Sequence, residues 1–103
     1  MYSIIMSSTA KRDIDNISNF CSNVSTTYAK KVRYNIHLSI NSLLNFPKGY
    51  SIYVFYEDTT FRKQVSIKRY LIVFSVFEDY IFIHKIFDGR QNFNPISLII
   101  NNI

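Results

Sequence analysis

The sequence is poor in cysteine, glycine and proline, and each shortage narrows what the protein can be. Among its 103 residues there are one cysteine, two glycines and two prolines. The single Cys21 cannot form an internal disulfide and no signal-peptide pattern opens the chain, so we expect a cytoplasmic protein. Two glycines are too few for a phosphate-binding loop or a nucleotide fingerprint. We therefore expect no nucleotide cofactor.

Metal ligands and long apolar runs are equally scarce. The two histidines, His37 and His84, do not lie at the close spacings from which a tetrahedral metal site is built. No apolar run approaches the roughly 20 residues that a membrane-spanning helix needs. The sequence thus predicts no metal, no other cofactor and no membrane association.

Basic residues outnumber acidic ones. Twelve Lys and Arg against seven Asp and Glu give a net charge of +5, which favours association with phosphate or with an acidic protein. Residues 1–49 contain six basic and two acidic side chains, and residues 50–103 contain six and five, so the surplus lies in the first half. A chain of this length forms one hydrophobic core, and we treat residues 1–103 as a single domain.

Apolar residues recur every three or four positions in two stretches of the first half, which is the pattern of helices that bury one face. The two stripes are Ala10, Ile14, Ile17, Cys21 and Val24, and Ala29, Val32, Ile36, Ile40 and Leu43. Ser7 or Ser8 can cap the first helix, Ser25 or Thr26 can cap the second, and Pro47 ends it. We expect an antiparallel helical hairpin.

Beta-branched and aromatic residues dominate the stretch from Phe61 to Asn92, which predicts an antiparallel meander. The run Tyr70–Phe77 is apolar at nearly every position, as in a central strand covered on both faces. Two acidic residues separate it from a second such run, Tyr80–Phe87. These two runs are therefore predicted to pair as a hairpin.

Three further segments have weaker signals. Tyr2–Met6 has the composition of an edge or interior strand. Tyr50–Thr60 has the composition of a strand but the position of a loop, and the sequence leaves both open. Asn94–Ile103 begins with a cap residue and a proline, which predicts either a short helix or a tail that a partner orders.

The predicted fold is α+β, with the order β-α-α-β-β-β and the helical hairpin packed on one face of a mainly antiparallel sheet. Its core is predicted to contain Ile14, Ile17, Val32, Ile36, Ile40, Leu43, Ile72, Phe74, Ile81 and Ile83.

Four stretches together carry a family resemblance. They are STAKRDIDNISNF at 8–20, LLNFPKG at 43–49, FRKQVSIKRYLIVF at 61–74 and IFIHKIFDGRQNF at 81–93. Their order and spacing resemble the RelE/ParE superfamily of toxins, although no single stretch is specific. The resemblance implies a RelE/ParE-like fold and the toxin half of a bacterial type II toxin-antitoxin system. It also implies a small acidic antitoxin that wraps around the toxin in a hetero-oligomer.

Two mechanisms diverge within that superfamily, and both stay open. ParE-like members poison DNA gyrase without known catalytic residues, whereas RelE-like members are endoribonucleases that cut mRNA on the ribosome with basic side chains. Leu71 stands where RelE-like nucleases carry a strand arginine, and Phe93 with an apolar tail stands where they carry a Tyr or His. An apolar Leu71 cannot stabilise the negative charge of the transition state. The sequence is therefore closer to the ParE-like branch.

Basic residues gather at the ends of the predicted strands. The candidate target-binding residues are Arg62, Lys63, Lys68, Arg69, Lys85 and Arg90. If the chain is a ribonuclease, Lys68, Arg69 and Arg90 are its candidate catalytic residues. Arg90 is the strongest candidate, because it lies in a glycine-containing turn directly after a buried strand. For Arg62 and Lys63, charged protection of a sheet edge is an equally good explanation.

A second set of residues is predicted to bind the antitoxin. Basic side chains along the second helix and aromatic side chains before the meander make up this set: Lys30, Arg33, Tyr53, Phe55 and Tyr56. His84 is expected to be a structural residue with a hydrogen-bond partner. A small nucleic-acid-binding module that is not a toxin is a third interpretation, weakened because no aromatic-and-basic motif for stacking bases is evident.

Overall fold

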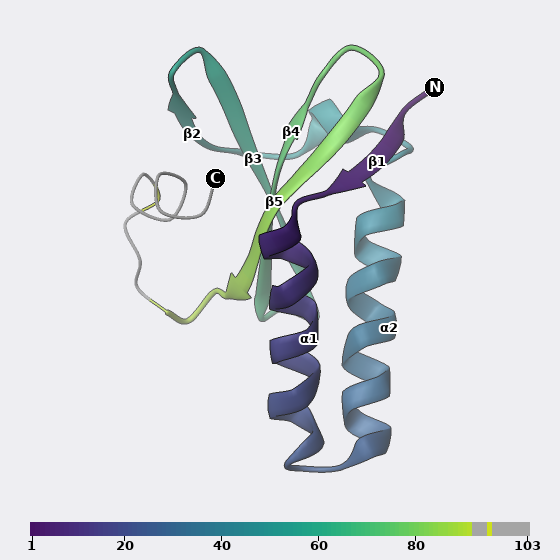
Figure 1. The fold of residues 1–103 in the computed structure, drawn as a ribbon. Coiled ribbons are helices and arrows are strands. Elements are labelled where there is room, and N and C mark those ends of the chain that lie inside the picture. The colour runs from purple at the N-terminus through teal and green to yellow at the C-terminus, as the bar shows by residue number, and fades with distance from the viewer. Residues whose placement is uncertain (92–94, 96–103) are drawn as a thin grey trace.

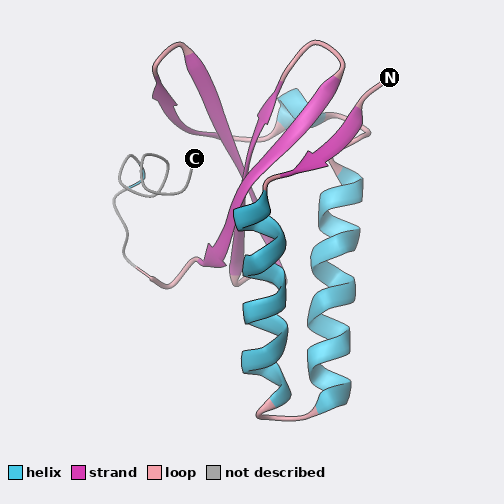
Figure 2. Ribbon diagram, viewed as in Figure 1, coloured by secondary structure: helices cyan, strands magenta, loops and turns pink. Residues whose placement is uncertain are grey.

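The computed structural model describes residues 1–91 and 95, which form a helical hairpin packed against a twisted sheet (Figures 1 and 2). The elements are β1 (Ser3–Met6), α1 (Ser8–Ser22), α2 (Thr26–Ser42), the short 3₁₀ helix η1 (Pro47–Gly49), β2 (Ile52–Tyr56), β3 (Thr59–Ser66), β4 (Tyr70–Val76) and β5 (Tyr80–Asp88). Among the described residues, no helix is both long and apolar enough to cross a membrane. The predicted helix or tail at Asn94–Ile103 lies outside the described residues, apart from position 95.

Serine side chains begin both helices, as predicted. The Ser7 hydroxyl accepts a hydrogen bond from the Ala10 amide, and the Ser25 hydroxyl accepts one from the Tyr28 amide. Each bond satisfies one of the amides that the first helical turn leaves without a partner. The prediction that Val24 continues the apolar stripe of α1 is wrong. The chain leaves the helix after Ser22 to reach the next cap, and Val24 lies 75% exposed in the connection.

The sheet has the order β1-β5-β4-β3-β2, with β4 at its centre. β4 and β5 pair antiparallel from Tyr70 opposite Asp88 to Val76 opposite Ile81, which confirms the predicted hairpin. β1 lies at one edge and runs parallel to β5. The undecided segment Tyr50–Thr60 supplies β2, the turn and the start of β3, so the meander has one strand more than the predicted order.

Side chains are buried on both faces of the sheet, but far more of them on the face that packs against the helices. The main core lies between the helices and the sheet, and Ile36, Phe74 and Ile83 within it have no exposed surface. A smaller cluster on the opposite face contains Phe61, Val73 and Phe87. Nine of the ten predicted core residues are buried, and the prediction for Ile17 is only partly right. Ile17 packs against the core but lines an open cleft, so its side chain is half-buried.

His84 lies in the smaller layer and has a hydrogen-bond partner, as expected. Its Nε2 is 2.9 Å from the Ser75 hydroxyl, which itself donates to the Thr60 carbonyl. Because that hydroxyl has one proton to give, Nε2 must be the donor to Ser75, and this fixes the tautomer. The rings of Phe61 and Phe82 lie 4.6 and 4.9 Å from the imidazole. Burial lowers the pKa of His84 from 6.5 to about 4.

This environment predicts a loss of stability in mild acid. The unfolded chain protonates His84 near pH 6.5 and the folded chain only near pH 4. As pH falls through that window, the unfolded state binds more protons and the free energy of unfolding decreases. Urea denaturation at a series of pH values measures this decrease. His84→Gln removes the ionisable group, and an undiminished decline in that variant would contradict the assignment.

Candidate functional site

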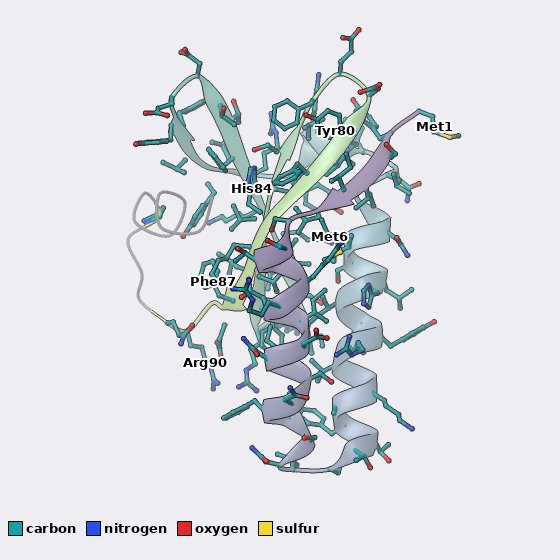
Figure 3. The ribbon with its side chains drawn as sticks, in the orientation of Figure 1. Met1, Met6, Tyr80, His84, Phe87 and Arg90 are labelled. Carbon is teal, nitrogen blue, oxygen red and sulfur yellow. The ribbon has the colours of Figure 1, made fainter. Side chains whose placement is uncertain are left out.

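An open cleft of about 440 Å³ lies between α1 and the ends of β4 and β5. Its α1 wall presents Asp13, Asn16, Ile17 and Phe20, and Phe20 is 66% exposed at its rim. Its strand wall consists of Arg69, Tyr70, Lys85, Ile86, Phe87, Asp88, Arg90 and Gln91. Figure 3 shows Phe87 near the end of β5 and Arg90 beyond it. Three of the six candidate target-binding residues therefore surround one cleft.

The carboxylate of Asp88 is the hub of this site. Its Oδ2 accepts hydrogen bonds from Arg69 Nε at 3.0 Å and from Arg90 Nη2 at 2.8 Å. Its Oδ1 accepts from the Arg90 backbone amide at 3.0 Å and from Arg90 Nε at 3.1 Å. One carboxylate thus holds two guanidinium groups. The Asp88 carboxylate and the two guanidinium groups together carry one net positive charge. The Arg90 side chain, which is 71% exposed, presents this charge to solvent.

The local charges fix the protonation states of these groups. Hydrogen bonds from the Arg90 side chain are the largest cause that holds the pKa of the Asp88 carboxyl far below its ordinary value of 3.8. Asp88 is consequently ionised throughout the physiological range. Burial raises the pKa of Tyr70 to about 12, helped by the Cys21 thiol 3.7 Å from its hydroxyl. The Tyr70 phenol therefore stays neutral and is buried beneath the cleft.

Gly89 allows the two turns at this end of the sheet to meet. Its amide donates a 2.6 Å hydrogen bond to the Arg69 carbonyl. A Cβ at this position would lie 2.6 Å from Leu71 Cδ1 and 3.1 Å from the Arg69 carbonyl oxygen. A larger residue would therefore require the end of the Leu71 side chain to move and the Arg69 carbonyl to shift by a few tenths of an ångström, so glycine suits the close approach.

Lys85 has a structural contact of its own. Its ammonium is 2.8 Å from Asp13 Oδ1, and both side chains are mostly buried. The other oxygen, Asp13 Oδ2, accepts from the Ile86 amide at 2.9 Å. A β-bulge precedes this contact, because Val73 pairs with Lys85 while the next residue, Phe74, pairs with Ile83. Lys85 directly follows this bulge, and its ion pair with Asp13 connects β5 to α1.

The remaining candidate target-binding residues do not line the cleft. Arg62 donates to the Tyr50 carbonyl at 2.8 Å, and the Lys63 ammonium lies 5.9 Å from the centre of the Tyr53 ring. Both occupy β3 away from the Asp88 carboxylate. Lys68 is in the β3–β4 turn next to Arg69, beside the cleft.

The predicted antitoxin-binding residues fall into two groups. Lys30 and Arg33 are on α2, where Arg33 pairs with Asp15 at 2.8 Å across the helical hairpin. Tyr53, Phe55 and Tyr56 form most of β2, at the edge of the sheet. The two tyrosines pack against the smaller core cluster, whereas Phe55 is 67% exposed.

Sequence reasoning missed the two carboxylates that organise the site. The role of Asp88 could have been predicted from the sequence, because an acidic residue directly before the Gly-Arg turn is placed to bind that arginine. The role of Asp13 could not, since 72 residues separate it from Lys85. Within residues 1–91, no cluster of three His, Cys, Asp or Glu side chains is placed to hold a metal ion.

The Asp88 hub predicts a clear order of stabilities. Asp88→Asn removes the shared charge and leaves Arg69, which is partly buried, with a weaker partner, so the free energy of unfolding should fall. Asp15→Asn is the matched control, because its exposed pair with Arg33 contributes at most about 1 kcal/mol. Urea denaturation at neutral pH compares the two variants. A loss for Asp88→Asn no larger than that for Asp15→Asn would contradict the role of the hub.

Comparison with known proteins gives a likeness in fold. No family model matches the sequence, and neither does any curated protein. A solved chain of the chromosomal ParDE TA system from P. aeruginosa matches with a TM-score of 0.74 and 19% sequence identity. The match covers 85% of this chain and 96% of that chain. At this identity the match shows the fold alone, and it confirms the predicted α+β fold.

Proposed function

We propose that this chain is the toxin of a bacterial toxin-antitoxin pair, that it acts in the cytoplasm, and that it inhibits growth by poisoning DNA gyrase. The observation that carries the proposal is the likeness in fold to a chain of a ParDE TA system over nearly all of that chain's length. The net charge of +5 is consistent with neutralisation by a small acidic antitoxin.

The chemistry of the cleft favours binding over catalysis. A ribonuclease needs groups that exchange a proton near neutral pH and cations free to stabilise a phosphate. The Tyr70 phenol, with its pKa raised to about 12, is a poor proton donor or base. Lys85 and Arg69 are each paired with a carboxylate. Leu71, which pairs with Val65 and Phe87 inside the sheet, brings no charge.

Arg90 is the side chain that we propose binds the target. The Asp88 carboxylate holds its guanidinium through both oxygens, yet the side chain is 71% exposed. An arginine ordered before binding loses less rotamer freedom when a partner arrives. Arginines of this kind are enriched among the residues that dominate protein-protein affinity.

This role predicts the effect of Arg90→Ala. The variant should fold normally, because the side chain it loses is mostly exposed, but inhibition of gyrase supercoiling should weaken by at least about tenfold, equal to 1.4 kcal/mol. Growth arrest on expression should weaken with it. Arg12→Ala is the matched control, since it removes an exposed arginine on α1 that does not line the cleft.

The ribonuclease alternative has a distinct outcome in the same variants. If mRNA is cut at codon boundaries on translating ribosomes, and cutting is lost in Arg90→Ala or Lys68→Ala, the chain is a RelE-like endoribonuclease and the gyrase proposal is wrong. Purified toxin that leaves supercoiling unchanged at saturating concentration would count equally against it.

Antitoxin binding predicts a second measurement. We propose that the antitoxin covers Lys30 and Arg33 on α2 and the aromatic side chains of β2. Charge attraction steers such an encounter, so the association rate should fall as ionic strength rises, while the dissociation rate changes little. Stopped-flow mixing of the chain with the proposed acidic antitoxin measures both rates. Phe55→Ala, which removes exposed apolar surface, should instead speed dissociation and leave the salt dependence intact.

A further inference from the structure

Two turns of the sheet have backbone conformations that their sequences do not favour. Glu57 and Asp58 join β2 to β3 with φ of 48° and 63°, and Ile67 and Lys68 join β3 to β4 with φ of 56° and 55°. The second turn closes with a hydrogen bond from the Arg69 amide to the Ser66 carbonyl at 3.1 Å. Positive φ at both central residues is the geometry for which Asn-Gly is the preferred pair. Neither turn contains glycine.

Ile67 is the least suitable residue of the four. A β-branched side chain in the left-handed region is a steric outlier, whereas Asp and Asn tolerate it. Burial does not offset the strain, because Ile67 is 46% exposed. The conformation of Ile67 therefore destabilises the folded chain and leaves an aliphatic side chain exposed to solvent. Strain of this kind is concentrated at functional positions.

The strained turn is held firmly from two sides. Ser66, which is 1% exposed, accepts a hydrogen bond from the Ser39 hydroxyl at 2.8 Å and donates one to the Asn35 carbonyl, so the turn is fixed to α2. On the other side the Arg69 carbonyl accepts the Gly89 amide. The turn and the Asp88–Arg90 turn thus lie side by side at one end of the sheet, as their places in Figure 1 also indicate.

We propose that Ile67, Lys68 and Arg90 form one target-contact surface, here called the turn surface, which docks on an acidic protein. Its partner would offer an apolar hollow for Ile67, bordered by carboxylates for Lys68 and Arg90. This inference rests on the proposed function, and it adds an apolar contact to the basic ones.

The composition of the turn surface favours a protein partner. Single-stranded nucleic acids are bound by aromatic side chains that stack on bases, and an exposed isoleucine offers no such contact. An aliphatic side chain within a basic rim suits an apolar protein hollow in an acidic surface. The target is favoured over the antitoxin because the turn surface is continuous with Arg90 through the Gly89–Arg69 bond.

Ile67→Asn separates function from stability. Asparagine tolerates the left-handed conformation, so the midpoint of thermal unfolding should rise by about 4 to 8 °C. Loss of the apolar contact should raise the concentration for half-inhibition of supercoiling at least about tenfold. A residue with a purely structural role would move stability and activity in the same direction.

Two matched variants control for the chemistry of the change. Glu57→Asn makes the same substitution at the same position of the other turn, and it should raise the midpoint while leaving inhibition unchanged. Ile67→Val keeps a branched aliphatic side chain, and it should leave both measurements near those of the unaltered chain.

The outcomes distinguish this inference from the proposed function. An unaltered chain that neither arrests growth nor inhibits gyrase would overturn the proposed function and the inference with it. A toxic chain whose Ile67→Asn variant inhibits equally well would overturn the inference alone. Loss of antitoxin binding with full toxicity, self-association that Ile67→Asn abolishes, or DNA binding weakened by Lys68→Ala but not by Ile67→Asn would also overturn it.

Discussion

Covering β4 on both faces is the constraint on which the rest of the structure depends. The helices bury one face of this strand through Phe74 and Ile72, and Val73 is buried in the smaller cluster opposite. A central strand of this kind has no room for an uncompensated charge. Lys68, Arg69, Lys85 and Arg90 accordingly lie near strand ends or beside a carboxylate. Arg62 and Lys63 lie within β3, where Arg62 donates to the Tyr50 carbonyl and Lys63 lies over the Tyr53 ring. Placement of the candidate site follows from packing before any question of function arises.

Two carboxylates then decide which cations remain available. Asp13 binds Lys85 and the Ile86 amide, so it joins the first helix to the last strand. Asp88 binds Arg69 and Arg90, so it orders the turn that follows that strand. Counting formal charge along the sequence would treat these three basic residues as equivalent. In the fold, Lys85 connects β5 to α1 through Asp13, and Arg69 stabilises the turn through Asp88. Only Arg90 projects outward.

The sequence predicted those features that depend on local patterns. The helices follow from apolar spacing and serine caps, and the Tyr70–Phe87 hairpin follows from two apolar runs around a short polar gap. Tyr50–Thr60 stayed undecided because its composition favoured a strand and its position a loop, and Glu57–Asp58 lacks the glycine that marks a tight hairpin turn. Ile17 was predicted to be fully buried because the spacing of apolar residues shows which face of a helix meets the core, but not how deeply each residue on that face is buried.

Contacts between distant residues were beyond local patterns. The link between Asp13 and Lys85 spans 72 residues, and no composition signal marks the bulge that precedes Lys85. The approach of Gly89 to Arg69 likewise depends on the twist and register of β4 and β5. Residue types at strand ends could indicate a basic site, but they could not divide its members between support and binding.

Two departures from local sequence preference lie together at one end of the sheet, whereas the Glu57–Asp58 turn lies at the opposite end of β3. Ile67 occupies a left-handed position better suited to asparagine, and the adjacent Arg69 shares one carboxylate with Arg90. A sequence selected for stability alone would place Asn-Gly in the turn and give each arginine its own acid. Instead both compromises occur at the end of the sheet where the cleft opens. Because the main core is well packed, the fold tolerates them, and the location of this tolerated strain coincides with the proposed target-contact surface.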